Sequence, residues 1–274
     1  MRDTLKLKSN KELGQHFLKN KNTISRICQL PSLAIDFIIE IGPGPGTLTL
    51  PLMELKKPLY VIEKDSRTKD YLESILPIES VLIQDATKID FNKLAAQLKW
   101  GQQTGWLVSN LPYNVSAVLL RLFLDCEHFK FMTLMFQKEV GEKLLPKFAL
   151  NNSLRTLVQS IFQVRLVEIV KPGAFHPPPK VDSIVLDFQM INPPTFPRNN
   201  MALLEQFVRP VFQHPRKQIF AKLKSIFQNT EVDLAGLMQK LHISNQDRAE
   251  KLTQEQIMGL FEEYQRFVSS RAPE

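Results

Sequence analysis

Hydrophobic runs that suit β-strands alternate with stretches of helical period along the first half of the chain. Each run is short, rich in β-branched residues and interrupted by few polar positions, which is typical of strands in a parallel sheet covered on both faces. The stretches between the runs place hydrophobic residues at helical spacing. This alternation predicts a doubly wound α/β domain with a mostly parallel sheet. The predicted strands are residues 35–41, 58–63, 80–85, 106–110 and 131–137, and residues 114–126 are predicted as a helix.

The pattern changes in the second half of the chain. Residues 164–170 and 183–190 flank a proline-rich loop and predict two late antiparallel strands. Residues 191–200 (INPPTFPRNN) fit neither period, and from Met201 onward the pattern is only helical. We therefore predict an α/β domain over residues 1–194 and a small all-α C-terminal domain over residues 195–274.

The composition is that of an ordinary globular protein, with 43% hydrophobic and 23% charged residues among 274. No hydrophobic run is long enough to span a membrane, and the charged N-terminus lacks the apolar core of a secretory signal. Cys28 and Cys126 supply neither a disulfide framework nor a four-ligand metal site. We therefore expect a cytoplasmic monomer without a metal. A net charge of +7 favours a polyanionic partner such as nucleic acid.

Three strand ends in succession carry groups that suit a nucleoside cofactor. After the first central strand, residues 40–46 (EIGPGPG) form a glycine-rich turn that opens a helix, and glycine lets the backbone approach a ligand closely. Glu63 ends the next strand, 21 residues after Gly42, where an acidic side chain reaches ribose hydroxyls. Asp85 ends the third strand, where its carboxylate can accept a hydrogen bond from an adenine amino group.

This glycine-rich turn has two alternative interpretations. A glycine turn without a ligand is equally common when it stands alone, but here acidic strand ends accompany it. A dinucleotide site requires G-x-G-x-x-G, and the sixth position of this turn is Thr47 rather than glycine. The turn also lacks a phosphate-binding lysine. A nucleoside cofactor without a pyrophosphate fits better, which favours S-adenosylmethionine.

The fourth strand ends in the tetrapeptide Asn110-Leu111-Pro112-Tyr113, which suits methyl transfer to an amino group on a base. An exocyclic adenine nitrogen is a weak nucleophile because its lone pair is delocalised into the ring. Acceptors for its two hydrogens turn the lone pair toward the methyl group, and Asn110 with the carbonyl of Leu111 or Pro112 supplies them. Tyr113 offers a face on which an extruded base can stack, although a buried core tyrosine is the alternative.

A second aromatic side chain is expected in the stiff loop that carries residues 174–180 (AFHPPPK). Phe175 is the candidate for the second stacking face, with a core or loop anchor as the alternative. Lys180 is a candidate phosphate contact, and a solvated loop lysine is an equal alternative.

With these motifs the chain resembles the bacterial small-subunit (16S) ribosomal RNA adenine dimethyltransferases over nearly its full length. The matching segments are Leu13 to Leu18 (LGQHFL), Glu40 to Thr49, Asn110 to Asn114, Gln137 to Glu139 and Ala174 to Ser183. The resemblance implies a Rossmann-like class I methyltransferase that dimethylates N6 of two adjacent adenines near the 3′ end of 16S rRNA in an immature small subunit. It also implies contacts to S-adenosylmethionine at His16, Leu18, Gly42, Glu63, Asp85 and Asn110.

The chain departs from that family in two places. Residues 146–156 (PKFALNNSLRT) stand where the family has a glycine-containing loop, so the rim of the active site is expected to differ. Residues 214–217 (HPRK) replace a more basic run, so RNA contacts there are expected to be weaker or shifted.

Basic residues nevertheless cluster at both ends of the chain. No acidic residue occurs from Gln206 to Thr230, and the candidate phosphate contacts in this span are Arg216, Lys217 and Lys222, with a solvated helix face as the alternative. Residues 1–22 form a basic N-terminal arm. Two other functions stay open: a 23S rRNA adenine methyltransferase of the macrolide-resistance type, and a non-catalytic ribosome assembly factor.

Overall fold

The structure is a computed structural model, and it describes residues 4–10, 12–29, 31, 34–145, 147, 150–192, 196, 198–214, 216–228 and 230–270. Several positions within the segments discussed above lie outside the described residues. They are Arg2 and Lys11 of the basic arm, Pro146, Phe148 and Ala149 of the rim loop, residues 193–195 at the predicted domain boundary, and Pro215.

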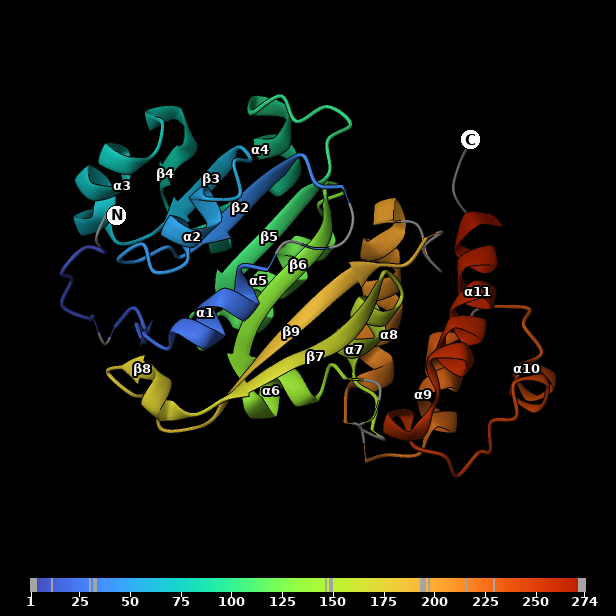
Figure 1. Cartoon of the computed structure of the whole chain (residues 1–274). Helices are drawn as coiled ribbons and strands as arrows, with labels where there is room; N and C mark the ends of the chain where they lie inside the picture. The colour runs from blue at the N-terminus through green and yellow to red at the C-terminus, as the bar shows by residue number, and fades with distance from the viewer. Residues whose placement is uncertain are drawn as a thin grey trace. The chain divides into compact units, whose positions relative to one another are not determined.

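A seven-stranded sheet in the order β4-β3-β2-β5-β6-β9-β7 forms the centre of the α/β part (Figure 1). Strands β2 to β6 pair in parallel, β9 is antiparallel to β6, and β7 lies beside β9 at the edge. The predicted mostly parallel sheet is confirmed. The strands are β2 (Phe37–Ile41), β3 (Leu59–Glu63), β4 (Val81–Ile83), β5 (Gly105–Asn110), β6 (Phe129–Gln137), β7 (Phe162–Val170) and β9 (Ser183–Met190).

Helices lie on both faces of this sheet (Figure 1), as expected when successive parallel strands are joined by crossovers. Helix α5 shows why they pack: it buries Leu119, Leu120 and Phe123 along one side. The helices are α1 (Lys21–Ile27), α2 (Thr49–Met53), α3 (Lys69–Ile75), α4 (Phe91–Gln97), α5 (Ser116–Leu124) and α6 (Lys138–Glu142), with short 3-10 turns η1 (Ser66–Thr68), η2 (Ile78–Ser80), η3 (Ala86–Lys88) and η4 (Pro172–Ala174).

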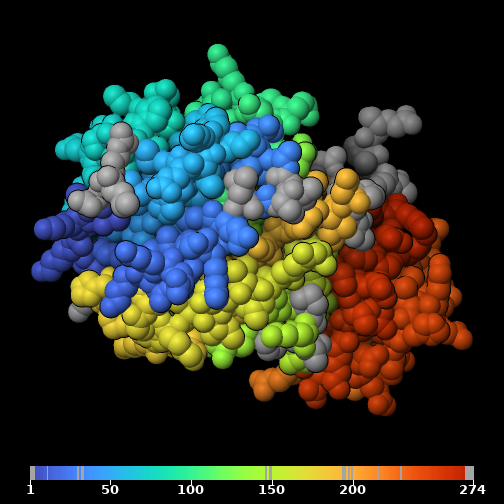
Figure 2. Space-filling model, viewed as in Figure 1, coloured from blue at the N-terminus to red at the C-terminus, as the bar shows by residue number. Residues whose placement is uncertain are grey.

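A separate two-stranded sheet joins the N-terminal segment to the proline-rich loop. Strand β1 (Phe17–Leu18) pairs antiparallel with β8 (Phe175–His176), and Lys19 donates its backbone N–H to the Ala174 carbonyl at 2.8 Å. Figure 2 shows the dark blue N-terminal segment lying against the yellow part of the chain that contains β8. Two segments far apart in sequence are therefore neighbours beside the main sheet.

The chain divides into two compact units. The first contains residues 1–142 and 163–190, and the second contains residues 143–162 and 191–274. The chain passes finally into the second unit at residue 191, close to the predicted domain boundary at residue 195. Residues 143–162, however, belong to the helical unit and not to the predicted α/β domain. The reason is a set of hydrogen bonds within that unit, from the Asn151 N–H to the Glu250 carbonyl at 2.6 Å and from Gln254 Nε2 to the Thr156 carbonyl at 3.0 Å.

The second unit is built from helices, which confirms the predicted all-α C-terminal region. Phe196, Phe207 and Phe261 form its aromatic core, with Phe196 and Phe261 edge to face at 5.0 Å between ring centroids. In the part of the chain that the structure describes, no helix is both long and apolar enough to cross a bilayer. The helices are α7 (Ser153–Gln159), α8 (Met201–Phe212), α9 (Ile219–Ile226), α10 (Leu234–Lys240) and α11 (Gln254–Ser270), with 3-10 turns η5 (Arg198–Asn200) and η6 (Ala249–Lys251).

Candidate active site

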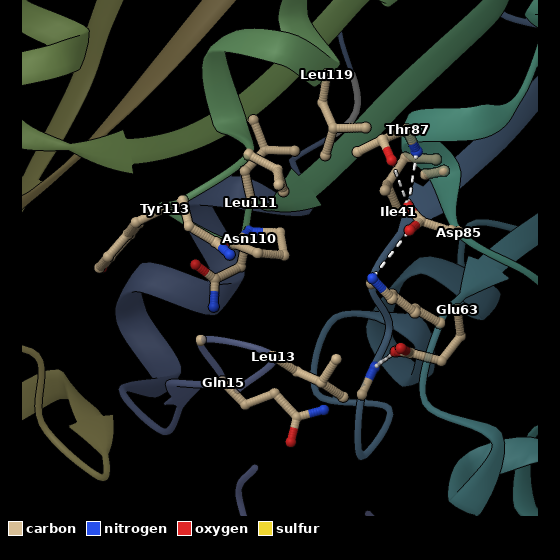
Figure 3. A pocket seen from close by; sticks show the side chains of 18 of the residues that line it. Leu13, Gln15, Ile41, Glu63, Asp85, Thr87, Asn110, Leu111, Tyr113 and Leu119 are labelled. Atoms are coloured by element: carbon tan, nitrogen blue, oxygen red, sulfur yellow. Dashed lines mark hydrogen bonds and ion pairs between the residues drawn. The ribbon is translucent and has the colours of Figure 1, made fainter. Parts of the chain in front are cut away.

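A cleft opens at the carboxyl ends of the parallel strands, where an α/β sheet places its ligands. Its volume is about 930 Å³, counting the space open to solvent. Figure 3 shows Glu63 and Asp85 on one side of the cleft and Asn110 with Tyr113 on the other. Its walls are residues 12–17, the turn after β2, the ends of β3, β4 and β5, and the first turn of α5.

The glycine-rich turn after β2 is open toward this cleft. Gly42, Gly44 and Gly46 all have positive φ, at 71°, 53° and 86°, a region that side chains with a Cβ rarely adopt. A Cβ on Gly46 would lie 2.9 Å from the Tyr71 hydroxyl, whereas a Cβ on Gly42 would meet nothing within 4 Å. Gly42 therefore leaves room beside the backbone that a ligand in the cleft can fill.

Glu63 lies at the end of β3 with only 5% of its surface exposed. One carboxylate oxygen accepts a hydrogen bond from the Gly44 N–H at 2.9 Å and the other from the Asp65 N–H at 2.8 Å. Burial raises the pKa of this carboxyl, and the two backbone donors oppose that rise. The carboxylate therefore fixes the glycine turn and keeps further lone pairs for a ligand in the cleft.

Glu40, in β2 beneath the glycine turn, is a second buried carboxyl. It is 1% exposed, and its Oε2 accepts a hydrogen bond from the Thr49 hydroxyl at 2.7 Å. Burial raises the pKa of Glu40 to about 8, helped by the nearby charge of Glu63. Glu40 is therefore protonated at neutral pH and ties β2 to the start of α2.

Asp85 follows β4 and borders the cleft beside Glu63 (Figure 3). Its Oδ1 accepts hydrogen bonds from the backbone N–H and the hydroxyl of Thr87, and its Oδ2 is 2.9 Å from Lys64 Nζ. The Thr87 hydroxyl and the Lys64 ammonium hold the pKa of Asp85 at about 2. Asp85 is therefore an ionised acceptor at the position where we expect an adenine amino group.

Asn110, at the end of β5, is bonded to the N-terminal segment. Its Nδ2 donates to the His16 carbonyl at 3.0 Å, so its Oδ1 is the atom left to accept a hydrogen bond. The carbonyl of Pro112 already accepts the Val115 N–H at 3.2 Å. The structure describes no such bond to the carbonyl of Leu111, which also borders the cleft. Between the carbonyls of Leu111 and Pro112, that of Leu111 is therefore the better candidate to accept a hydrogen bond from a ligand.

Tyr113 follows these residues and is held from two directions. Its hydroxyl is 2.5 Å from the Ser183 hydroxyl, and its ring is stacked against the His16 ring with 5.8 Å between centroids and 24° between planes. Burial raises the pKa of the Tyr113 phenol. His16 Nδ1 donates in turn to the Pro177 carbonyl at 2.9 Å.

Phe175 differs from its expected place. Only 1% of its surface is exposed, and it packs in the hydrophobic core with Leu18 and Val170 instead of bordering the cleft. The pairing of β8 with β1 turns the side chain inward, so Phe175 anchors the loop. Leu18 is also buried and borders a small hollow beside the glycine turn, together with Gly42 and Asn110. Lys180 is exposed.

Comparison with known proteins gives the family of this chain. Residues 6–266 match the family described as Ribosomal RNA adenine dimethylase. The protein named Ribosomal RNA small subunit methyltransferase A of Clostridium acetobutylicum is 33% identical over 94% of both chains, and that of Bdellovibrio bacteriovorus is 34% identical over 96% of this chain and 94% of its own. The chain belongs to the ribosomal RNA adenine dimethylase family. It is a methyltransferase.

Two solved structures have a fold similar to that of this chain. A dimethyladenosine transferase from Plasmodium falciparum has a TM-score of 0.72 at 22% identity, covering 92% of this chain and 98% of its own. The 23S rRNA methyltransferase ErmE has a TM-score of 0.68 at 21% identity, covering 91% of this chain and 99% of its own. The class I methyltransferase fold predicted for this dimethylase is confirmed.

The basic residues of the helical unit differ in how they are used. Arg216 and Lys217 are exposed between α8 and α9. Lys222 is half-buried, and its Nζ donates to the Val211 carbonyl at 2.8 Å in the last turn of α8. Burial lowers the pKa of Lys222. Arg216 and Lys217 are therefore open to a phosphate, whereas Lys222 stabilises the end of a helix.

Sequence reasoning missed several residues of the dimethylase cleft. Leu13, Gly14 and Gln15 form part of its wall, and Gln15 Nε2 donates to Asp65 at 2.9 Å. Two further side chains contact predicted site residues: Lys64 forms an ion pair with Asp85, and the Ser183 hydroxyl contacts the Tyr113 hydroxyl. Only the LGQHFL motif signalled the first group, because no periodicity relates the N-terminus to the strand ends.

Proposed function

We propose that this dimethylase transfers methyl groups from S-adenosylmethionine to N6 of two adjacent adenines near the 3′ end of 16S rRNA, giving dimethyladenosine in an immature small subunit. A ribosomal substrate places this activity in the cytoplasm. The names of the similar proteins support the small subunit as substrate, and the likeness to ErmE extends only to the fold. An Asn110-Leu111-Pro112-Tyr113 motif that lies intact in the cleft argues against a purely non-catalytic assembly factor.

The cleft fits S-adenosylmethionine, which supplies an electrophilic methyl group on a sulfonium. Gly42 leaves open space beside the backbone, and Glu63 has lone pairs for ribose hydroxyls. The ionised Asp85 accepts a hydrogen bond from the adenine amino group of the cofactor. Leu18 and Asn110 border the small hollow beside the glycine turn, and Asn110 is bonded to the His16 carbonyl, so these three residues are the remaining expected cofactor contacts.

The observation that carries the proposal is the bond from Asn110 Nδ2 to the His16 carbonyl. This bond fixes the orientation of the Asn110 amide, so that Oδ1 is the atom that accepts one hydrogen of the target amino group. The Leu111 carbonyl accepts the other hydrogen. Together they present the nitrogen lone pair without a strong base, while Tyr113 stacks on the extruded adenine. Transfer would form the N6–C bond as the C–S bond of the sulfonium breaks, releasing S-adenosylhomocysteine, and the methylated nitrogen would then lose one proton to water. The first product keeps one amino hydrogen, so one of the same acceptors can orient a second transfer.

One assay tests this function. The protein is incubated with radiolabelled S-adenosylmethionine and immature small or large subunits, and the labelled base is mapped. We expect dimethyladenosine in 16S rRNA alone. Label in 23S rRNA would instead assign the macrolide-resistance activity, and no label would assign the assembly factor.

Asn110→Ala provides the matched variant for this assay. We expect single-turnover transfer to slow by roughly ten- to a thousandfold while RNA binding changes little, because the lost acceptor acts mainly in the transition state. Monomethyladenine accumulates if the second transfer suffers more. Wild-type rates with an intact dimethyl product would show that the motif does not orient the nitrogen.

A further inference from the structure

The Tyr113 hydroxyl is hydrogen-bonded to Ser183, a residue that has no role in the function proposed above. The Tyr113 and Ser183 hydroxyls are 2.5 Å apart, and Ser183 has no exposed surface. We propose that Ser183 is a positioning residue for methyl transfer, because its buried hydroxyl fixes the Tyr113 ring at the angle on which the extruded adenine stacks. This inference rests on the proposed function.

Ser183 is on a rigid part of the fold. It is the first residue of β9 and is paired with Gln137 of β6, and β9 is an interior strand of the main sheet. The preceding residue, Asp182, accepts the Lys138 N–H at 2.9 Å through its carbonyl. A hydroxyl on this backbone is a fixed reference point for a side chain that reaches it.

Tyr113 lies in the segment between β5 and α5, so the backbone pairing of a strand or helix does not fix its position. A contact to the sheet therefore helps to hold its side chain. A tyrosine ring turns readily about its terminal torsion, so packing or a hydrogen bond must set its plane. The His16 ring supports one face at 5.8 Å and is itself bonded to the Pro177 carbonyl. Ser183 holds the far end of the ring, and the two contacts together define the stacking plane.

A purely structural role for Ser183 predicts a second partner for its hydroxyl within the sheet. In the described part of the chain, the Tyr113 hydroxyl is the partner that the Ser183 hydroxyl has. Loss of the Ser183 hydroxyl therefore acts on the ring of Tyr113 before it acts on the sheet.

The kinetic test compares the wild type, Ser183→Ala, Tyr113→Phe and the double variant in single-turnover methylation of immature small subunits. Each single change removes one half of the same hydrogen bond, so we expect each to slow transfer by about two- to tenfold. The double variant should be no slower than either single variant, because both act through one contact. The concentration of subunits at half-maximal rate should change less than the maximal rate.

Ser160→Ala is the matched control. Ser160 is equally buried, but it lies in the second unit and donates to the Leu157 carbonyl at 2.7 Å. We expect a lower melting temperature and an unchanged transfer rate. Effects of Ser183→Ala and Tyr113→Phe that multiply in the double variant, or a Ser183→Ala variant that loses only thermal stability, would overturn the proposal.

A second measurement needs no substrate and therefore separates this inference from the proposed function. The chain has four tyrosines, so the NMR spectrum of protein with isotope-labelled tyrosine rings is simple, and Tyr113→Phe identifies the Tyr113 signals. In Ser183→Ala we expect these signals to shift and the ring to flip faster, with the other three tyrosines unchanged. An unchanged Tyr113 signal would exclude the positioning role even if the wild type methylates 16S rRNA as proposed.

Discussion

Two carboxyl groups beneath the cofactor side of the cleft are buried to a similar extent but are held differently. Glu63 receives two backbone N–H donors, which stabilise the charged form. Glu40 receives only the Thr49 hydroxyl and lies near the charge of Glu63, so its pKa rises to about 8. Glu63 is thus suited to bind hydroxyl groups, whereas Glu40 acts as a neutral hydrogen-bonding group in the core.

The raised pKa of Glu40 predicts that stability falls as pH rises. The folded protein keeps this proton up to about pH 8, whereas the unfolded chain releases it near pH 4.5. Between these values the folded state binds more protons, so the free energy of unfolding decreases with pH, by up to about 1.4 kcal/mol per pH unit from this group. Denaturant unfolding at several pH values should show a flatter dependence for Glu40→Gln, which keeps the Thr49 bond. Parallel curves for the two proteins would mean that Glu40 ionises normally.

Glu63 gives a prediction about binding. Glu63→Ala should weaken the binding of S-adenosylmethionine by roughly 1 to 3 kcal/mol, because hydrogen bonds that buried hydroxyls donate to a charged group fall in that range. Calorimetric titration with the cofactor measures the change. Glu63→Gln is the control for shape, since it keeps an acceptor while losing the charge. Unchanged affinity in Glu63→Ala would remove this residue from the site.

At this scale, the sequence was informative where chemistry follows a strand end. Glu63, Asp85 and Asn110 could be placed on one edge of the sheet because parallel strands share the direction of their carboxyl ends. Phe175 could not be placed, because its orientation depends on pairing with β1, near the other end of the chain. Ser183 ends the matching segment Ala174 to Ser183, but the sequence did not indicate its role, since a serine at a strand start is ordinary until its partner is known.

Among the elements, the N-terminal segment has an unusual place. It has little secondary structure of its own, yet it forms a wall of the cleft and is tied down at several points. The Leu5 N–H donates to the Pro45 carbonyl of the glycine turn at 2.9 Å. The Arg67 guanidinium holds Asp65 through two hydrogen bonds and also donates to the Lys8 carbonyl at 3.1 Å. Gln15 donates to the same Asp65.

These ties predict that Arg67 slows the exchange of the cofactor. Arg67→Ala frees the Lys8 carbonyl and weakens the hold on Asp65, so the wall should open more often. The dissociation rate of S-adenosylmethionine should rise about severalfold, as expected for the loss of one exposed hydrogen bond. Stopped-flow displacement measures the rate. Lys69→Ala, which removes a nearby exposed pair with Glu73, is the matched control. Equal release rates in both variants would show that the Arg67 contacts do not restrain the wall.

The main strands and helices could be predicted from the pattern of hydrophobic residues, because each of them has a regular local spacing of such residues. Strands β2 to β6 and helix α5 lie close to their predicted ranges. The small β1–β8 sheet was not predicted, because a two-residue strand has no period to detect. Residues 143–162 were assigned to the α/β domain because sequence order alone does not reveal which hydrophobic core a helix joins.

In the whole molecule, the cleft with the predicted catalytic residues and the exposed, positively charged residues belong to different units. The cleft with Asn110 and Tyr113 is in the first unit, and the exposed Arg216 and Lys217 are in the second. Phosphate contacts position a nucleic acid without reading its sequence, so the second unit can add affinity while the cleft selects the adenine. The two contributions should then respond differently to salt.

The last prediction uses this difference in salt response. Replacing Arg216 and Lys217 with alanine should weaken binding of small-subunit RNA and reduce the slope of log affinity against log salt by about one unit per lost phosphate contact, because fewer counterions are released. Fluorescence anisotropy over a range of salt concentrations measures the slope. Lys222→Ala is the matched control: its ammonium already donates to the Val211 carbonyl, so we expect a lower melting temperature and an unchanged slope. A slope that falls with Lys222→Ala but not with the double variant would move the RNA contact from the exposed turn to α9.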